Sequence, residues 1–336
     1  MKIFYKGYYG FSNLGDDIFV HTIKWFSDKY NHIYKIHGYN LPDNINGKKV
    51  KNKFEKIMCD LYYSLTCKGI IYWGGSTFEN SGSLSDLRYY ITRIKYLRNK
   101  TLAFGISIGP FKNSNEKRNV LDNMNKLNYV GVRDIASLKY DSKFEFTFDL
   151  AVILPYIFKF KEQEKRSQKI VSVNLSKANN LEEYKSLYKD FIIFNKENIS
   201  KVNIIVFNPS DFKISKEFYD EFKNEHISID LIKYTTNTEY ILGKVVESDL
   251  ILGSRLHSGI IAYAYKIPFI LNEYHEKCSD FVNTVNQRFD FDKFKFTKDK
   301  NINYVIEKAS EFKNPDYFRD IILNQFENIS KEINRL

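Results

Sequence analysis

The chain has 336 residues and a formal net charge of +10, because 51 lysine and arginine residues outnumber 41 aspartate and glutamate residues. Hydrophobic residues make up 43% of it, too many for a disordered chain, and 15 glycines and 6 prolines exclude a collagen-like protein. The longest largely apolar stretch, residues 258–271, is shorter than the roughly 20 residues of a membrane span, and the first ten residues lack a signal-peptide core. We therefore expect a cytoplasmic protein of about two domains.

The three cysteines, Cys59, Cys67 and Cys278, form no C-x-x-C pattern, so neither a disulfide framework nor a zinc site is expected. The positive charge favours an anionic partner: nucleic acid, an anionic membrane surface or a phosphorylated small molecule. The densest lysine runs lie at residues 47–53, 159–166 and 288–300. None resembles a compact nucleic-acid module, so we expect no nucleic-acid partner. Solvated surface is the simplest interpretation of these runs, and aromatic residues among the lysines of 288–300 leave a weak hold on the inner membrane face as the alternative.

Short apolar, β-branched and aromatic runs alternate with amphipathic stretches along the first half of the chain. The runs predict strands at residues 2–5, 33–36, 69–73, 102–106, 129–132 and 144–148. The stretches predict helices at residues 16–30, 54–66, 84–98, 115–127 and 134–140. This alternation indicates βαβ units, which build a parallel sheet.

The second half repeats the pattern and so predicts a second parallel sheet. Its strands are expected at residues 170–174, 202–208, 228–232, 250–253 and 269–271. Its helices are expected at residues 181–194, 215–223, 238–247, 254–265 and 276–285. Helical periodicity then runs from about residue 303 to 336 without a further strand.

A charge-rich segment at 156–168 follows Pro155 and lacks apolar periodicity, which is typical of a linker. We expect an N-terminal Rossmann-like domain at 1–155, a C-terminal Rossmann-like domain at 165–290, and a helical segment at 291–336 that packs back on the domains. The predicted fold class is α/β, with two doubly wound domains facing across a cleft. Ligands of open α/β sheets bind outside the carboxyl ends of the strands, so the site is expected in that cleft.

Two glycine-containing segments follow predicted strands in the first domain. Residues 8–17 combine tight-turn glycines with Asn13 and Asp16, which can cap a helix, and the ligand-binding interpretation makes Asp16 a candidate base. The G-x-G-x-x-G dinucleotide pattern is absent there. Gly74 and Gly75 can expose backbone N–H groups to an anion or a sugar. A plain turn is the alternative interpretation of both segments.

The most informative segment spans residues 248–259, where an apolar strand ends and a helix begins. Ser254 is a good N-cap, which places Arg255 and His257 in the first helical turn. A helix N-terminus attracts anions and disfavours cations unless an anion is present. The two basic residues therefore predict a bound anion, against the alternative of an exposed basic turn.

Two further cations follow predicted strands. Arg133 stands at a strand tip, where it can clamp an anion bidentately or pair with the adjacent Asp134, which is well placed to cap the next helix. Lys277 follows the last strand of the second domain. Lys277 has two equally supported interpretations: it makes a second cationic contact to the anion, or it is a solvated surface charge.

Taken in order, these segments resemble the polysaccharide pyruvyl transferase family over about residues 7–282. The resemblance rests on Asn13-Leu14-Gly15-Asp16, Gly74-Gly75, Ser107-Ile108-Gly109-Pro110, Arg133-Asp134 with Ser137, Asp149, Ser254-Arg255-Leu256-His257, and Pro268 with Lys277. It implies a GT-B-like fold whose first domain takes the acceptor and whose second takes the donor. It also implies an enzyme of cell-surface polysaccharide biosynthesis that moves the pyruvyl group of phosphoenolpyruvate onto a glycan hydroxyl pair as a ketal, with a lipid-linked acceptor left open.

The resemblance links donor binding to Arg133, Arg255, Leu256 and His257. Phosphoenolpyruvate carries a carboxylate and a phosphate, and arginine matches both groups bidentately. His257 is the candidate acid that protonates the enol methylene carbon, and Asp16 is the weaker candidate for the base that activates the sugar hydroxyl. The other predicted substrate-binding residues are Ser254, Lys277, Asn13, Gly74 and Gly75. No metal or cofactor is expected, with phosphoenolpyruvate as co-substrate.

Two other functions stay open at this point. A GT-B nucleotide-sugar glycosyltransferase would use the same helix N-termini and basic residues to hold a diphosphate. A non-catalytic glycan- or membrane-binding scaffold would need no intact site, and the pair Arg255 and His257 argues against it.

Overall fold

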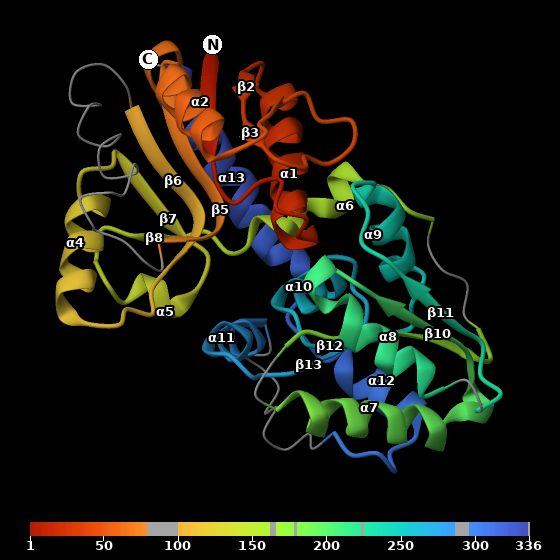
Figure 1. Ribbon diagram of the computed structural model, residues 1–336. Coiled ribbons are helices and arrows are strands. Elements are labelled where there is room, and N and C mark those ends of the chain that lie inside the picture. Colours follow the sequence, from red (N-terminus) through yellow and green to blue (C-terminus); the bar gives the residue numbers. More distant parts are fainter. Residues whose placement is uncertain (79–99, 162–165, 178–179, 223–224, 286–295, 335–336) are drawn as a thin grey trace. The chain divides into compact units, whose positions relative to one another are not determined.

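The computed structural model describes the chain except for residues 79–99, 162–165, 178–179, 223–224, 286–295 and 335–336 (Figure 1). Contacts within the chain divide it into two units. The first unit comprises Met1–Phe11, Gly15–Leu150 and Phe318–Leu336, and the second comprises Ser12–Leu14 and Ala151–Tyr317. The chain therefore leaves the first unit at residue 150 and returns to it at residue 318.

The first unit is built on a six-stranded parallel sheet with the order β2-β1-β5-β6-β7-β8. Its strands are β1 (Lys2–Lys6), β2 (Ile33–Lys35), β5 (Gly69–Phe78), β6 (Lys100–Ile108), β7 (Tyr129–Val132) and β8 (Glu145–Phe146). A second small sheet pairs β3 (His37–Gly38) with β4 (Lys48–Lys49). In the large sheet the strand order reverses between β1 and β5, and ligands of such sheets bind outside the strand ends at this reversal.

The helices that contribute to the first unit are α1 (Leu14–Lys29), α2 (Lys53–Thr66), α4 (Ser114–Met124), α5 (Ile135–Leu138) and α13 (Pro315–Asn334). Two of them begin with an asparagine cap. Asn52 accepts a hydrogen bond from the N–H of Glu55 at 2.9 Å, and Asn113 accepts one from Glu116 at 2.9 Å. These caps satisfy backbone donors that the first helical turn leaves without a partner.

The core of the first unit is completed by α13. The Phe326 ring lies 4.9 Å from that of Phe26, 5.2 Å from Trp73 and 5.4 Å from Phe104. The sequence predicted one helical segment here, whereas the structure has two helices, α12 (Ile302–Ala309) and α13. The second helix begins at Pro315, where proline is favoured as a first helical residue.

The second unit holds a five-stranded parallel sheet with the order β11-β10-β9-β12-β13. Its strands are β9 (Lys169–Asn174), β10 (Ile199–Ile205), β11 (Ile229–Ile232), β12 (Leu250–Gly253) and β13 (Phe269–Leu271). Its helices are α6 (Leu154–Ile157), α7 (Leu181–Phe194), α8 (Phe212–Asp220), α9 (Thr238–Val246), α10 (Leu256–Ala264), α11 (Glu276–Val285) and α12. Short 3₁₀ turns are η2 (Leu150–Ile153), η3 (Lys196–Asn198) and η4 (Pro209–Asp211). Here the order reverses between β9 and β12.

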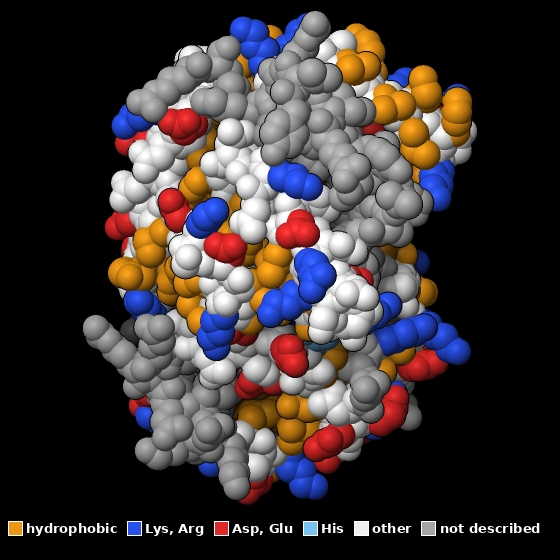
Figure 2. Space-filling model, turned by 90° about the vertical axis from the view of Figure 1, so that its left-hand side faces the viewer, with side chains coloured by type: hydrophobic (Ala, Val, Ile, Leu, Met, Phe, Trp, Pro, Cys, Tyr) orange, Lys and Arg blue, Asp and Glu red, His pale blue; other side chains and the backbone are white. Residues whose placement is uncertain are grey.

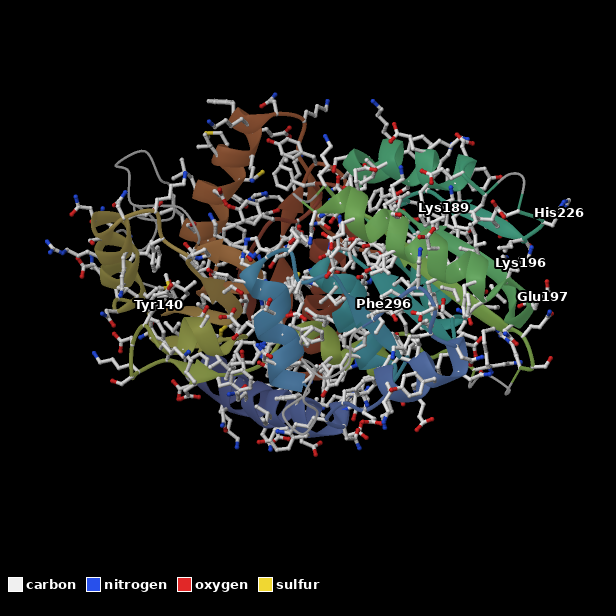
Figure 3. The ribbon with its side chains drawn as sticks, turned by 90° about the horizontal axis from the view of Figure 1, so that it is seen from below. Tyr140, Lys189, Lys196, Glu197, His226 and Phe296 are labelled. Atoms are coloured by element: carbon white, nitrogen blue, oxygen red, sulfur yellow. The ribbon has the colours of Figure 1, made fainter. Side chains whose placement is uncertain are left out.

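A hydrophobic core in the second unit joins residues of α7, α8 and α12 to β9, β10 and β12. Phe296 adds its ring to this core (Figure 3). Its ring centroid lies 5.0 Å from that of Phe191 and 6.1 Å from that of Tyr188, both on α7. Phe296, which precedes α12 in the chain, is thereby tied to α7.

Every predicted strand is present, and so is every predicted helix on described residues; the helix predicted at 84–98 lies outside them. Five elements have the predicted bounds, namely β7, β12, β13, α7 and α11. The predicted fold class of two doubly wound α/β halves with parallel sheets is therefore confirmed. In the described part of the chain, no helix combines the length and the apolar character that crossing a membrane requires.

Candidate functional site

The carboxyl ends of four strands of the first unit meet at one buried arginine. Arg133 follows β7 and is 7% exposed. Its Nη1 donates to Asp149 Oδ2 at 2.7 Å, its Nε to Ser107 Oγ at 2.7 Å, and its Nη2 to Ser76 Oγ at 3.2 Å. Because Asp149 is 3% exposed, this is a buried ion pair whose further donors are satisfied by two hydroxyls.

Asp134, the residue after Arg133, caps a helix instead of pairing with the arginine. Asp134 caps α5 by accepting a hydrogen bond from Ser137 N at 2.7 Å, which confirms the predicted cap. Its other oxygen accepts from Ser107 Oγ at 2.5 Å. The alternative of an ion pair between Arg133 and Asp134 is wrong, because the buried guanidinium pairs with Asp149 instead. Donor binding by Arg133 stays a prediction, and the structure gives this residue a role in joining four strand ends.

The glycine pair of β5 lies against α1. A Cβ atom added to Gly75 would stand 3.6 Å from Asp16 Oδ1, and one added to Gly74 would stand 2.6 Å from an aromatic ring of α1. Both glycines have positive φ, +70° and +77°, which other residues rarely adopt. Burial, and then the charge of Asp16, raises the pKa of Tyr9. Three predicted residues, Asp16, Gly74 and Gly75, therefore meet at the reversal between β1 and β5.

In the second unit, Asn174 ties together the loops at the strand-order reversal. Ser254 N donates to the backbone oxygen of Asn174 at 2.8 Å, and Arg255 N donates to its side-chain oxygen at 3.2 Å. The amide nitrogen of Asn174 donates to Ile205 O, at the end of β10, at 2.8 Å. The segment after β12 is thus held by the end of β9, which is itself hydrogen-bonded to the end of β10.

The predicted N-cap of α10 is wrong. Arg255 occupies the N-cap position and α10 begins at Leu256, so Arg255 precedes the first turn and His257 lies in it. Ser254 is fully buried, its N–H pairs with Asn174 at the end of β9, and its Oγ meets no hydrogen-bond partner among the described residues. The hydroxyl that closes this turn belongs to Ser258, which donates to Arg255 O at 2.6 Å.

The guanidinium of Arg255 is fixed by a buried carboxylate. Its Nε donates to Asp211 Oδ2 at 2.5 Å, and the side chain of Asp211 is 1% exposed against 26% for Arg255. Within the described residues, this guanidinium makes its ion pair through Nε, and the side chain remains partly exposed. Sequence reasoning missed Asp211, although the turn signal Asn208-Pro209 shortly before it marked a strand end.

Two more predicted residues follow neighbouring strands. Half-buried His257 lies in the first turn of α10, after β12, and Lys277 lies in the first turn of α11, after β13. Burial lowers the pKa of Lys277 to about 8. Asn13 also belongs to this unit, where the N–H of the next residue, Leu14, donates to Phe207 O at 3.0 Å. Since β12 and β13 are adjacent and parallel, Arg255, His257 and Lys277 lie along one edge of the sheet.

A sequence model of the polysaccharide pyruvyl transferase family matches residues 13–276, which is most of the chain. The chain belongs to this family. The match begins at Asn13, includes Arg133, Arg255 and His257, and ends one residue before Lys277. The predicted family is thereby confirmed, and membership of a polysaccharide pyruvyl transferase family implies a glycan acceptor.

Solved structures share the fold of this pyruvyl transferase at low sequence identity. The UDP-GlcNAc 2-epimerase of Methanocaldococcus jannaschii, solved with UDP-GlcNAc and UDP, gives a TM-score of 0.61 at 15% identity over 100% of both chains. The UDP-GlcNAc 2-epimerase of Neisseria meningitidis gives 0.58 at 11% identity, covering 98% of this chain and 100% of its own. A glycosyltransferase of Rickettsia africae gives 0.57 at 13% identity, covering 99% and 98%. These are GT-B folds, so the predicted GT-B-like class is confirmed. No curated protein matches the sequence.

The predicted site residues of this pyruvyl transferase fall into two sets. The first unit holds Asp16, Gly74, Gly75 and Arg133. The second unit holds Asn13, Ser254, Arg255, Leu256, His257 and Lys277. Among the residues that the structure describes, no three His, Cys, Asp or Glu side chains gather where they could hold a metal ion.

Proposed function

We propose that this protein transfers the enolpyruvyl group of phosphoenolpyruvate to two hydroxyls of one glycan and releases inorganic phosphate. A proton added to the methylene carbon turns it into a methyl group and makes the adjacent carbon electrophilic. The first hydroxyl attacks that carbon and loses its proton to a base. The second hydroxyl then attacks the same carbon and displaces phosphate. The departing phosphate takes up the proton of this hydroxyl, and the product is a pyruvate ketal.

The observation that carries this proposal is the partly exposed guanidinium of Arg255, held by buried Asp211 beside the N-terminus of α10. A helix N-terminus offers free N–H groups and a partial positive charge to an anion. Phosphoenolpyruvate needs contacts for a phosphate and a carboxylate, which arginine binds in a planar, bidentate way. Lys277, in the first turn of the helix that follows the neighbouring strand β13, supplies a second cation.

The proposed roles follow from chemistry and position. His257, in the first turn of α10, is the acid, because histidine titrates near neutral pH and a bound anion favours its charged form. Leu256 and Ser254 flank Arg255 on the donor side. Asp16 is the base for the acceptor hydroxyl. Asn13 binds substrate in the second unit, Gly74 and Gly75 bind substrate in the first, and Arg133 joins four strand ends of the first unit; no cofactor takes part.

The activity is tested with purified protein, phosphoenolpyruvate and candidate glycans. We expect phosphate release that depends on the glycan, together with an acceptor mass gain of one pyruvate ketal. Arg255→Lys is expected to raise the KM for phosphoenolpyruvate by roughly tenfold, because an ammonium makes no bidentate contact. Phosphate release with an unchanged KM in this variant would contradict the donor clamp. Thermal stabilisation by a nucleotide sugar, with no response to phosphoenolpyruvate, would favour a glycosyltransferase instead.

Lys277 predicts a pH dependence. Because its pKa is lowered to about 8, its ammonium is charged below pH 8 and neutral above it. We expect kcat/KM for phosphoenolpyruvate, which reports the free enzyme, to fall about tenfold as the pH rises through 8. Lys277→Arg should abolish this fall because a guanidinium stays charged, whereas exposed Lys266→Arg should leave it in place. A fall that persists in Lys277→Arg assigns the titration to another group.

A further inference from the structure

We propose that α2 is a membrane-docking helix that holds the first unit on an anionic lipid surface. Four large apolar side chains stand out from this helix into solvent: Phe54 is 73% exposed, Met58 50%, Tyr62 63% and Leu65 72%. No other helix in the described part of the chain exposes four large apolar side chains. The proposal concerns where the protein resides, and it stands independently of the transfer reaction.

These four residues form one stripe along the helix. Their spacing of four, four and three residues places them on the same side of an α-helix. The opposite side faces the fold: Asp60 is buried, and Cys67 and Tyr63 pack with Phe4 and Ile70. Since the inward side already supplies the packing that holds the helix, the outward stripe is not required for the core. An exposed apolar stripe of this size indicates an interaction surface.

Lysines border the stripe. Four of them are exposed: Lys48, Lys49 and Lys51 in the segment that leads into the helix, and Lys53 at its first position. The two carboxylates of α2 are already engaged. Glu55 accepts from Lys51 N at 2.7 Å and lies 3.5 Å from Lys48 Nζ. Buried Asp60 contacts Lys6 Nζ at 2.8 Å and His37 Nε2 at 2.9 Å. The outward surface of α2 and its leading segment is therefore apolar and cationic.

The positive charge of these lysines indicates what binds the apolar stripe of α2. A symmetric interface between two copies would bring the same lysines face to face, where like charges repel. An anionic lipid surface instead attracts the lysines while the apolar side chains enter the boundary between headgroups and acyl chains. Figure 2 shows hydrophobic side chains (orange) gathered at the upper right of the surface, at the height at which Figure 1 places α2, with Lys and Arg side chains (blue) beside them.

The test is co-sedimentation of the full chain with vesicles. We expect binding to vesicles of phosphatidylcholine and phosphatidylglycerol, little binding to phosphatidylcholine alone, and weaker binding as salt is added. The double variant F54S/L65S is expected to lower the partition coefficient at least about tenfold. The triple variant K49Q/K51Q/K53Q is expected to lower it about fivefold for each lysine removed. Because all five side chains are exposed, these variants should fold, which circular dichroism checks.

The matched control is Phe194→Ser, which removes a 60% exposed aromatic side chain from α7 of the second unit and should bind vesicles as the original chain does. Equal loss in this control and in F54S/L65S would overturn the proposal. So would the absence of any vesicle binding by the original chain. A dimer in size-exclusion chromatography that F54S/L65S converts to a monomer, without vesicle binding, would assign the stripe to contact between copies and likewise overturn it.

Discussion

Replacing His257 with asparagine is expected to lower kcat for pyruvyl transfer by about 10²- to 10⁴-fold, which is the usual contribution of a positioned general acid. Asparagine keeps a polar side chain in the first turn of α10, but its amide is not acidic enough to protonate the methylene carbon. The KM for phosphoenolpyruvate should stay close to its original value, because Arg255 and the helix N-terminus still hold the donor. Steady-state rates of phosphate release with a pyruvyl-accepting glycan measure both constants.

The matched control is His226→Asn, at an exposed position of the second unit where the side chain extends from the edge of the fold (Figure 3). Its φ of +54° is one that asparagine tolerates, so the substitution adds no backbone strain. We expect full activity from this variant. If His257→Asn retains comparable activity, the proton comes from another group.

Asp149→Asn is expected to lower the free energy of unfolding of the first unit by about 3–5 kcal/mol. The substitution removes the counter-charge of Arg133 while the guanidinium stays buried, and a buried charge without a partner is costly. Removing both charges together, in Arg133→Met with Asp149→Leu, should cost less than the sum of the two single substitutions, because no uncompensated charge remains.

Both tryptophans of the chain, Trp25 and Trp73, lie in the first unit, so urea titration followed by tryptophan fluorescence reports that unit. The control is Asp28→Asn, which breaks an exposed ion pair with Lys24 and should cost no more than about 1 kcal/mol. A loss in Asp149→Asn as small as in this control would mean that the buried pair is not what joins the strand ends.

The order of strands and helices could be predicted because each element carries its own periodicity. The segment of β12 and α10 shows where prediction from local periodicity fails. Leu250–Gly253 is a continuous apolar run and its bounds follow directly. The start of α10 does not, because Ser254 has the side chain of a cap but remains hydrogen-bonded to Asn174, a residue 80 positions earlier. The preference of serine for the N-cap position is overridden by this long-range hydrogen bond, which the sequence pattern does not reveal.

The same limit applies to the site. Arg133 and Arg255 were recognisable because cations at strand and helix ends are unusual. Their pairing was not, since Asp149 stood out only through the family resemblance, Asp211 is a single acid within an ordinary segment, and Asp134 was the nearer partner of Arg133 in the sequence. Pairing is decided by which strand ends are neighbours in the sheet. That information enters only with the strand order.

The return of α13 to the first unit has a consequence for biosynthesis. Phe326 fills the core around Trp73, yet the ribosome makes it only after residues 151–317 of the second unit. At about 5–20 residues per second, the emerging chain carries a first unit with an open aromatic core for many seconds while the second unit forms. The half that is translated first is therefore the half that is completed last.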